Sequence, residues 1–448
     1  MRKHQANARW LAGTLATFVS LSPLASKAQS GFIEESSLTL NLRHWYSHEV
    51  GHKATYFAAP SDQGIRPVRD RTAWLQGAKL DYVSGFTQGA IGLGLDFSVY
   101  GAVALERSSL AAAGGSSRLL VEKDGDVVND WGKVGVAAAK FKAGETVVKV
   151  GRQQVRTPVM DYADTRTLPA SFEGVSLESH DIDALTLKAG YFDRATPRTG
   201  AGREDLTLTM TARRVEGDWV GYAGGDYQMG KSTKASVYLN RYNDIWDRTY
   251  LGFNTSHRWS PAWNSEVQAD YYNTQSSGRE LAGNIDQQVY GLSLTQSYLN
   301  HSVKLGLQQV VGDEYFDYVG ESNAISLPNT MLSYYNGPNE RSFQVKYTND
   351  FTAYGVPGLK TILWYIKGWN IDGTDYDGGR NAAYSWASRQ DGESHYEVGA
   401  FLNYVVQSGR LKNLSILTGN AWHRASRNQI EGNLEEFRFI VNLPVKLI

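Results

Sequence analysis

Residues 437–447 read FRFIVNLPVKL, with apolar side chains recurring at every second position. In an extended strand, one face carries Phe437, Phe439, Val441, Leu443, Val445 and Leu447. The other face carries Glu436, Arg438, Asn442 and Lys446, because successive side chains of a strand point to opposite faces. A strand with one face for lipid and one for water is typical of an antiparallel β-barrel that spans a bilayer around an aqueous lumen.

The same alternation recurs along the chain, for example in residues 38–43, 91–99, 185–191 and 303–308. Short turn-like breaks fall near residues 84–88, 142–145, 180–182, 229–233, 258–263, 298–301, 351–358 and 408–413. Longer polar segments lie between these breaks, which is the pattern of short inner turns and long outer loops. Eight inner turns join nine hairpins, so we expect an all-β transmembrane barrel of about 18 strands.

Two other interpretations of the strand pattern remain open. Residues 206–214 also alternate weakly, and as a wall strand they would raise the count to nineteen; we assign them to a loop excursion. A soluble secreted β-sandwich would need a second sheet to cover each apolar face. The sandwich would also leave the difference between short and long connections unexplained.

The N-terminal residues have the pattern of a secretory signal peptide. Arg2, Lys3 and Arg9 precede an apolar stretch at residues 10–21, and the small-residue site Ser26-Lys27-Ala28 follows. We therefore expect residues 1–28 to be removed after Ala28, leaving a porin-like barrel domain at residues 29–448. Outside this segment no run of eighteen apolar residues occurs, so the sequence predicts no transmembrane helix.

Composition excludes several classes of function. The chain has 448 residues and no cysteine, which rules out disulfides, thiol catalysis and thiolate metal sites. Without the four basic residues of the signal peptide, 41 basic residues stand against 46 acidic ones, which gives no support to nucleic-acid binding. The 26 tyrosines and 12 tryptophans suit the two interfaces of a membrane barrel.

Several segments resemble one family over essentially the whole predicted mature chain. They are residues 31–46 (GFIEESSLTLNLRHWY), 81–96 (DYVSGFTQGAIGLGLD), 167–179 (TLPASFEGVSLES), 224–229 (GGDYQM), 283–288 (GNIDQQ), 336–347 (NGPNERSFQVKY), 354–359 (YGVPGL) and 404–415 (YVVQSGRLKNLS). In this order they look like the OprD family of outer-membrane porins. The resemblance implies an eighteen-stranded barrel, an eyelet of infolded loops, a row of basic side chains on the wall, and passive uptake of small nutrients, often carboxylates.

A segment after Gly151 loses the alternation for about twenty residues while holding both charge signs. The resemblance at residues 167–174 favours a constriction folded into the lumen, whereas the residues alone fit a solvated surface loop equally well. In a constriction, Arg156 and Arg166 would offer cationic contacts, with Asp161 and Asp164 opposite. Opposed charges across a narrow opening orient or filter charged solutes.

Three basic residues are expected on the inner wall. Arg43, Lys346 and Arg438 point inward by strand parity and match positions where the family pattern carries a basic residue. The alternative is that they only solvate the channel and pair with carboxylates such as Glu436.

The chain also departs from the family pattern. Leu417 and Gly419 stand where the family usually has two arginines, and Tyr334 stands where it often has an acidic residue. Glu321 and Ser322 do match an acidic-serine pair of the same outer loop. The loss of cations and the gain of Tyr334 favour a less strictly anionic, aromatic substrate.

His48-Glu49-Val50-Gly51-His52 spells the H-E-x-x-H motif, in which two histidines one helical turn apart bind zinc. Its context is poor, because it follows an extended segment and contains Gly51. We read these residues as polar positions in the first outer loop and expect no metal and no cofactor.

These observations favour a porin of the Gram-negative outer membrane that is not an enzyme and lets small nutrients diffuse into the periplasm. The expected partners are outer-membrane lipid, lipopolysaccharide and small solutes, with monomer and homo-oligomer both open. The alternatives are a barrel enzyme, zinc-dependent or another hydrolase, and a structural or adhesive barrel with a filled lumen.

Overall fold

The computed structural model describes residues 31–115, 118–323 and 326–448. The predicted signal peptide, residues 1–28, lies outside the described residues. None of the helices within the described ranges is long and apolar enough to cross a membrane.

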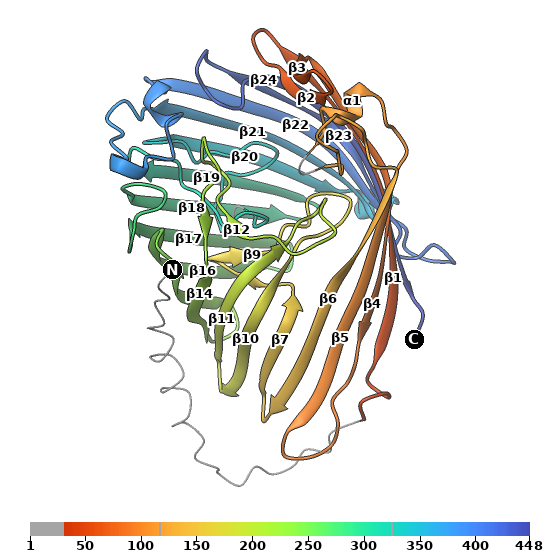
Figure 1. The fold of residues 1–448 in the computed structure, drawn as a ribbon. Helices are drawn as coiled ribbons and strands as arrows, with labels where there is room; N and C mark the ends of the chain where they lie inside the picture. The colour runs from red at the N-terminus through yellow and green to blue at the C-terminus, as the bar shows by residue number, and fades with distance from the viewer. Residues whose placement is uncertain (1–30, 116–117, 324–325) are drawn as a thin grey trace, which may run out of the picture.

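Antiparallel strands form one closed ring, as Figure 1 shows. Their pairing yields an 18-stranded sheet whose first strand, β1, pairs with both β4 and β24, so the ring has no free edge. Closure satisfies the backbone hydrogen bonds that lipid cannot satisfy. The wall strands are β1 (Ser37–His52), β4 (Asp70–Val83), β5 (Gly92–Ala104), β6 (Asp130–Ala143), β7 (Thr146–Gln153), β10 (Ser171–Ile182), β11 (Leu185–Thr196), β14 (Val220–Met229), β15 (Thr233–Tyr242), β16 (Trp246–Ser260), β17 (Trp263–Ser276), β18 (Asp286–Tyr298), β19 (His301–Val311), β20 (Arg341–Asp350), β21 (Leu359–Ile371), β22 (Glu393–Val405), β23 (Ser415–Ala425) and β24 (Asn433–Lys446).

The predicted strand count and most of the predicted turns are confirmed. Each of the eight breaks marks a connection between consecutive wall strands. The break expected at residues 180–182 is displaced, because β10 continues to Ile182 and the chain turns at residues 183–184, where Ala184 has a positive φ of 64°. Residues 206–214 form a loop excursion, in which β12 (Leu206–Thr207) pairs only with β13 (Glu216–Gly217), so the alternative of nineteen wall strands is wrong.

Side chains follow the alternation on the outer face, but apolar residues also occur on the inner face. On β5, Leu93, Leu95 and Phe97 are exposed on the outside, whereas Asp96 and Ser98 are buried inside. On β24, Ile440 breaks the predicted pattern, because this apolar residue faces inward and packs in a cluster with Trp45. A single apolar side chain on a wall strand therefore does not by itself mark the face that meets lipid.

Loops fill part of the interior. The connections contain the short pairs β2 (Phe57–Ser61) with β3 (Gly64–Val68) and β8 (Arg156–Thr157) with β9 (Met160–Asp161), besides the helix α1 (Ser109–Ala112). An aromatic cluster joins the inner wall of β14–β19 to residues of loops 197–219, 312–340 and 372–392. Figure 1 shows β9 and β12 lying within the ring of strands. The bore is therefore narrowed from the β14–β19 side.

Candidate constriction in the barrel lumen

The loop of residues 154–170, between β7 and β10, crosses the lumen. At one end the Tyr272 hydroxyl of β17 donates to the Pro158 carbonyl at 2.8 Å. At the other end the Arg43 guanidinium of β1 donates to the Asp164 carboxylate at 2.7 Å. Because β17 lies eight strands from β1 in a ring of 18, these anchors are on nearly opposite walls. The infolded constriction loop expected from the sequence is confirmed.

A second loop, residues 312–340 between β19 and β20, supports the first. Tyr162 and Ser322 form a backbone bridge, and Ala163 N donates to the Glu321 carbonyl at 2.8 Å. Asn323 N donates to the Asp161 carbonyl at 3.0 Å. The two loops therefore form one structure inside the barrel.

Wall side chains hold the second loop in place. The Glu397 carboxylate of β22 accepts hydrogen bonds from the backbone N–H groups of Leu332 and Ser333, at 3.2 and 2.8 Å. The indole N–H of Trp364 donates to the same carboxylate at 2.5 Å. A buried carboxylate that accepts three hydrogen bonds holds these backbone groups in one position.

Charged residues gather around Trp45 on β1, and we call this group the Trp45 cluster. Its members are Arg43, Glu49, Arg71, Arg118, Asp164, Arg166, Glu436 and Arg438. Five arginines stand against three carboxylates, a formal excess of two positive charges. The cluster therefore presents a net positive field to the lumen beside the anchored end of loop 154–170.

Most arginines in the cluster are already paired. Arg438 binds Glu436 through both nitrogens of its fork, with one contact at 2.9 Å. Glu49, almost fully buried, binds Arg71 and Arg118. In these ion pairs the guanidinium N–H groups already have carboxylate partners, so they are not free to bind a passing anion.

Arg166 is different, because no carboxylate lies within ion-pair distance of it in the described residues. One terminal nitrogen of its guanidinium donates to the Thr165 carbonyl at 2.8 Å, and its Nε is buried without a hydrogen-bond partner. Burial, together with Arg118 and Arg438, lowers the pKa of Arg166 well below its usual value. A guanidinium still keeps its proton at neutral pH. An approaching anion would therefore offset the repulsion of Arg166 by Arg118 and Arg438.

The other predicted loop charges lie close to one another. Arg156 is 69% exposed, donates to the Tyr162 hydroxyl at 3.0 Å and stacks over that ring. Its Nε is 3.8 Å from Asp161, whose pKa is raised by burial. Asp161 and Asp164 thus lie beside Arg156 and Arg43 respectively, and a selective role for these charges remains a prediction.

The predicted residues of loop 312–340 are structural neighbours of the constriction. Glu321 accepts from Arg198 Nε at 2.8 Å, and Ser322 is buried at the bridge to Tyr162. The half-buried Tyr334 ring lies 6.1 Å from that of Tyr318, between ring centroids.

Lys346 lies apart from the Trp45 cluster, on β20. It stands directly opposite Lys304 of β19. Lys304 Nζ donates to the Pro328 carbonyl at 3.3 Å. Within the described part of the chain, Lys346 has no ion pair or side-chain hydrogen bond, so its ammonium group remains available in the lumen.

The structure gives a packing reason for the departures at Leu417 and Gly419. A Cβ atom at Gly419 would come within 2.7 Å of the Phe401 ring and closer still to the Ala400 carbonyl. Phe401 packs against Trp364 with centroids 5.3 Å apart, and Leu417 borders this group. Aromatic surface therefore occupies this part of the wall, where the family pattern has arginine.

Sequence analysis missed a group of lysines on β4, β6 and β7. Lys140 and Lys149 both bind Asp96, at 2.6 and 2.8 Å, and Lys79 lies 3.8 Å from Asp81. Lys133 donates to backbone carbonyls of residues 197–198. Inward parity of Asp96 on the alternating segment 91–99 was the signal that could have located these residues.

The H-E-x-x-H segment lies on the wall strand β1 and not in the first outer loop as predicted. Glu49 is buried inside the barrel, whereas His48 and His52 have the opposite strand parity. His48 contacts Thr72 at 2.9 Å, and His52 lies 3.3 Å from Glu435. Because the motif requires a helix that points all three residues to one ion, this strand cannot form the protease site.

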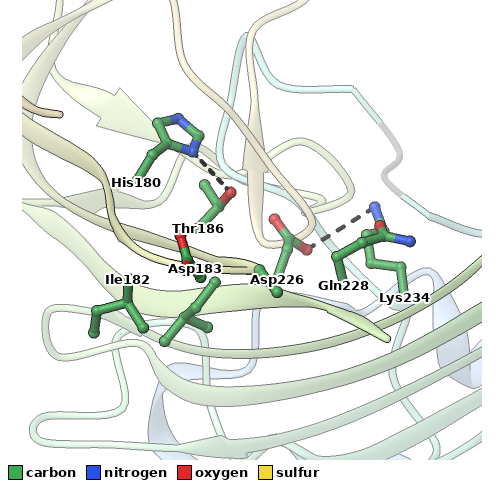
Figure 2. A pocket seen from close by; sticks show the side chains of 9 residues that line it. His180, Ile182, Asp183, Thr186, Asp226, Gln228 and Lys234 are labelled. Carbon is green, nitrogen blue, oxygen red and sulfur yellow. Dashed lines mark hydrogen bonds and ion pairs between the residues drawn. The ribbon is translucent and has the colours of Figure 1, made fainter. Parts of the chain in front are cut away.

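A cavity of about 260 Å³ lies at the β10–β11 turn, and Figure 2 shows the side chains that line it. It is formed by the β10–β11 turn with residues of β14 and β15, including Asp226 and Lys234, which lie 4.0 Å apart. These residues lie on or between β10, β11, β14 and β15, at least five strands from β1 in the ring.

Most of the chain matches known proteins. Residues 30–447 match the family described as outer membrane porin, OprD family. The chain is 32% identical over 428 residues to Porin D of Pseudomonas aeruginosa, covering 93% of this chain and 92% of that protein. It is 28% identical to Porin-like protein GalP of Pseudomonas putida, covering 98% of each.

Solved structures agree with the sequence matches. Pseudomonas aeruginosa OccD3 (OpdP) is 38% identical, with a TM-score of 0.82 and coverage of 94% of this chain and 93% of that one. Pseudomonas aeruginosa OpdK, solved with vanillate, is 27% identical, with a TM-score of 0.80 and coverage of 93% and 100%. These relatives are porins of the outer membrane, which are channels. The chain belongs to the OprD family of outer membrane porins.

Proposed function

We propose that this porin prefers small carboxylates, including aromatic ones, and that Arg166 is the principal contact for the carboxylate at the constriction. The observation that carries the proposal is the unpaired Arg166 guanidinium within a cluster of net positive charge. Arg43 and Arg438 are tied to Asp164 and Glu436, so they contribute field and loop position more than direct binding.

The attraction between Arg166 and a carboxylate is strong enough to draw the solute in and weak enough to release it. Two unit charges 4 Å apart attract by about 4 kcal/mol at an effective dielectric constant near 20. Desolvation of the solute offsets part of this attraction, so the anion is drawn in and still leaves. Lys346, Lys304 and Lys149 provide further positive positions along the wall.

Aromatic surface beside the charges supports the substrate class. Trp45 lies within 6 Å of both the Arg166 and Arg438 guanidinium carbons, and the Trp364–Phe401 pair replaces the expected arginines. One relative, OpdK, was solved with vanillate, an aromatic carboxylate. A flat ring could slide along such surfaces while its carboxylate exchanges between cations.

We infer that the chain is a channel and has no catalytic role, because the one protease-like motif points its residues to opposite faces of β1. The outward apolar side chains support contact with outer-membrane lipid and lipopolysaccharide. Both a monomer and a homo-oligomer are compatible with this function. A structural or adhesive barrel has a filled lumen and would show no uptake in the test below.

Uptake of labelled benzoate and of its uncharged isostere benzamide into proteoliposomes tests this function. After subtraction of the uptake into protein-free liposomes, we expect wild-type protein to admit benzoate faster than benzamide, and Arg166→Gln to remove most of this difference. Arg241→Gln is the matched control, because Arg241 pairs with Asp247 on the exposed surface at 2.6 Å. Equal uptake of the two solutes by wild-type protein would refute the carboxylate preference.

A further inference from the structure

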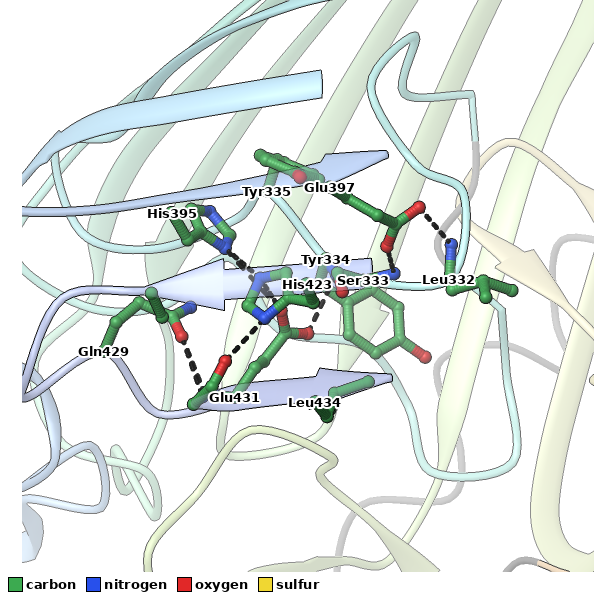
Figure 3. A network of polar contacts seen from close by, with 12 residues as sticks. Leu332, Ser333, Tyr334, Tyr335, His395, Glu397, His423, Gln429, Glu431 and Leu434 are labelled. Carbon is green, nitrogen blue, oxygen red and sulfur yellow. Dashed lines mark hydrogen bonds and ion pairs between the residues drawn. The ribbon is translucent and has the colours of Figure 1, made fainter. Parts of the chain in front are cut away.

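Three side chains converge at the outer part of the wall, as Figure 3 shows. They are His395 of β22, His423 of β23 and Glu431 of the β23–β24 loop. His395 Nδ1 lies 2.8 Å from His423 Nε2. Glu431 Oε2 lies 3.4 Å from His423 Nε2 and 3.7 Å from His395 Nδ1.

In each imidazole, the nitrogen that points away from the other two side chains already has a hydrogen-bond partner. His423 Nδ1 lies 2.7 Å from the Gly432 carbonyl, which can only accept, so this nitrogen carries the proton. His395 Nε2 lies 2.7 Å from Glu340 Oε1, and an ionised carboxylate also only accepts. When both imidazoles are neutral and keep these hydrogen bonds, His395 Nδ1 and His423 Nε2 both direct lone pairs inward.

Three electron-pair donors thus face one another in a nearly dry place. Both histidine side chains are at most 1% exposed. Glu431 Oε2 is buried without a hydrogen-bond partner, although Glu431 Oε1 accepts from Tyr334 N at 2.9 Å. Such an arrangement is costly unless a cation lies between the donors.

We propose that His395, His423 and Glu431 bind one divalent cation of the zinc class. Two imidazole nitrogens and one carboxylate oxygen form a donor set that this class prefers. Donors around tetrahedral zinc lie about 3.3 Å apart, given metal–ligand distances near 2.0–2.1 Å. The two contacts of Glu431 lie close to this value, and the two imidazoles need to part by about half an ångström.

The surroundings also match a metal centre. Glu340 and the Gly432 carbonyl hold the outward nitrogens, as second partners of zinc-binding histidines usually do. A cavity of about 10 Å³, room for about one water, is lined in part by Glu431 and Glu340. A proton shared by the two imidazoles, with the Glu431 carboxylate as its counter-ion, is the competing explanation, and metal analysis distinguishes the two.

A bound cation would connect elements that are separate in sequence. It would join β22 and β23 to the β23–β24 loop through Glu431. The other oxygen of Glu431 holds Tyr334 N, and Tyr334 lies in loop 312–340 of the constriction. The metal would therefore stiffen the outer part of the channel without touching the Trp45 cluster. This inference is independent of the proposed substrate preference.

Metal analysis of the purified full-length barrel in detergent tests the site, using zinc and then cobalt as probes. We expect one retained zinc per barrel and, with cobalt, the intense visible bands of a tetrahedral site. His423→Gln and Glu431→Gln should lose the retained metal. Glu340→Gln should bind it about 10- to 100-fold more weakly, because Glu340 positions His395.

His52→Gln is the matched control, because His52 lies 3.3 Å from a carboxylate on the outer surface. Heat-modified migration on gels shows whether each variant has folded. The proposal is overturned if folded wild-type protein retains no zinc, or if it retains zinc equally in the His423 and His52 variants. The first result would assign the cluster to a proton shared by the imidazoles.

Discussion

Arg43 of β1 and Asp164 of loop 154–170 form an ion pair of 2.7 Å inside the barrel. Arg43 also donates to the Asn442 side chain at 2.7 Å and to the Arg166 backbone carbonyl. One wall side chain thereby positions the segment that carries the unpaired guanidinium of Arg166. The contact of Arg43 with loop 154–170 therefore helps to set both how far the loop extends into the lumen and where the Arg166 charge lies.

Arg43→Gln should release this end of the loop. Both side chains of the ion pair are about a quarter exposed, so we expect the free energy of unfolding to fall by no more than about 1 kcal/mol. The single-channel current should become larger and noisier, because the loop gains freedom. Arg241→Gln, which removes a surface ion pair, should leave the current unchanged. A quiet, unchanged current in Arg43→Gln would show that this contact does not hold the loop.

Glu397→Ala should loosen loop 312–340. The substitution strands the N–H groups of Leu332 and Ser333 and the indole N–H of Trp364. Losing hydrogen bonds to a buried charged group should lower the free energy of unfolding by about 2 kcal/mol, measured as earlier unfolding in denaturant. Glu397→Gln keeps one acceptor and should fall between this variant and wild type. If both variants unfolded as wild type does, the carboxylate would not anchor the loop.

Channel noise should depend on pH through Glu314 of loop 312–340. Burial, with added repulsion from Asp313 and Asp286, raises the pKa of Glu314 to about 7. A raised pKa means that the neutral form packs better, so its stabilisation is present at low pH and is lost as pH rises through about 7. Loop fluctuations in bilayer recordings should therefore increase from pH 6 to pH 8. Glu314→Gln should be quiet at both values; persistence of the pH effect in this variant would assign it to another group.

Lys346→Gln should change stability and selectivity in opposite directions. Lys346 lies directly across from Lys304, and like charges at paired positions destabilise a sheet. Removing one charge should leave the barrel as stable or slightly more stable in denaturant, while anion permeability relative to cation permeability falls. Lys360→Gln, near the start of β21 and paired with Asp350 at 3.2 Å, serves as the control. Lower stability without a change in selectivity would contradict this role of Lys346.

The barrel was predictable because the membrane imposes a simple local rule. Alternation of apolar and polar side chains recurs in nearly every wall strand, and short turns carry glycine or polar residues. Ile440 shows the limit of the rule, since it is apolar and points inward against Trp45. The H-E-x-x-H segment shows another limit, because strand parity and not residue type decides which of its side chains can meet.

The constriction was only partly predictable. The loss of alternation after Gly151 located the loop, but strand parity says nothing about partners inside a loop. Which arginine stays unpaired depends on contacts between residues far apart in sequence, such as Arg43 with Asp164. The convergence of His395, His423 and Glu431 likewise follows from strand register and a loop conformation.

The most direct test of the account is the reversal potential across a bilayer that separates unequal concentrations of potassium benzoate. We expect preference for the anion in wild-type protein, a clear shift toward the cation in Arg166→Gln, and no shift in Arg241→Gln. A cation-selective wild-type channel, or an anion preference unchanged by Arg166→Gln, would contradict the claim that an unpaired arginine at the lumen-crossing loop selects the solute.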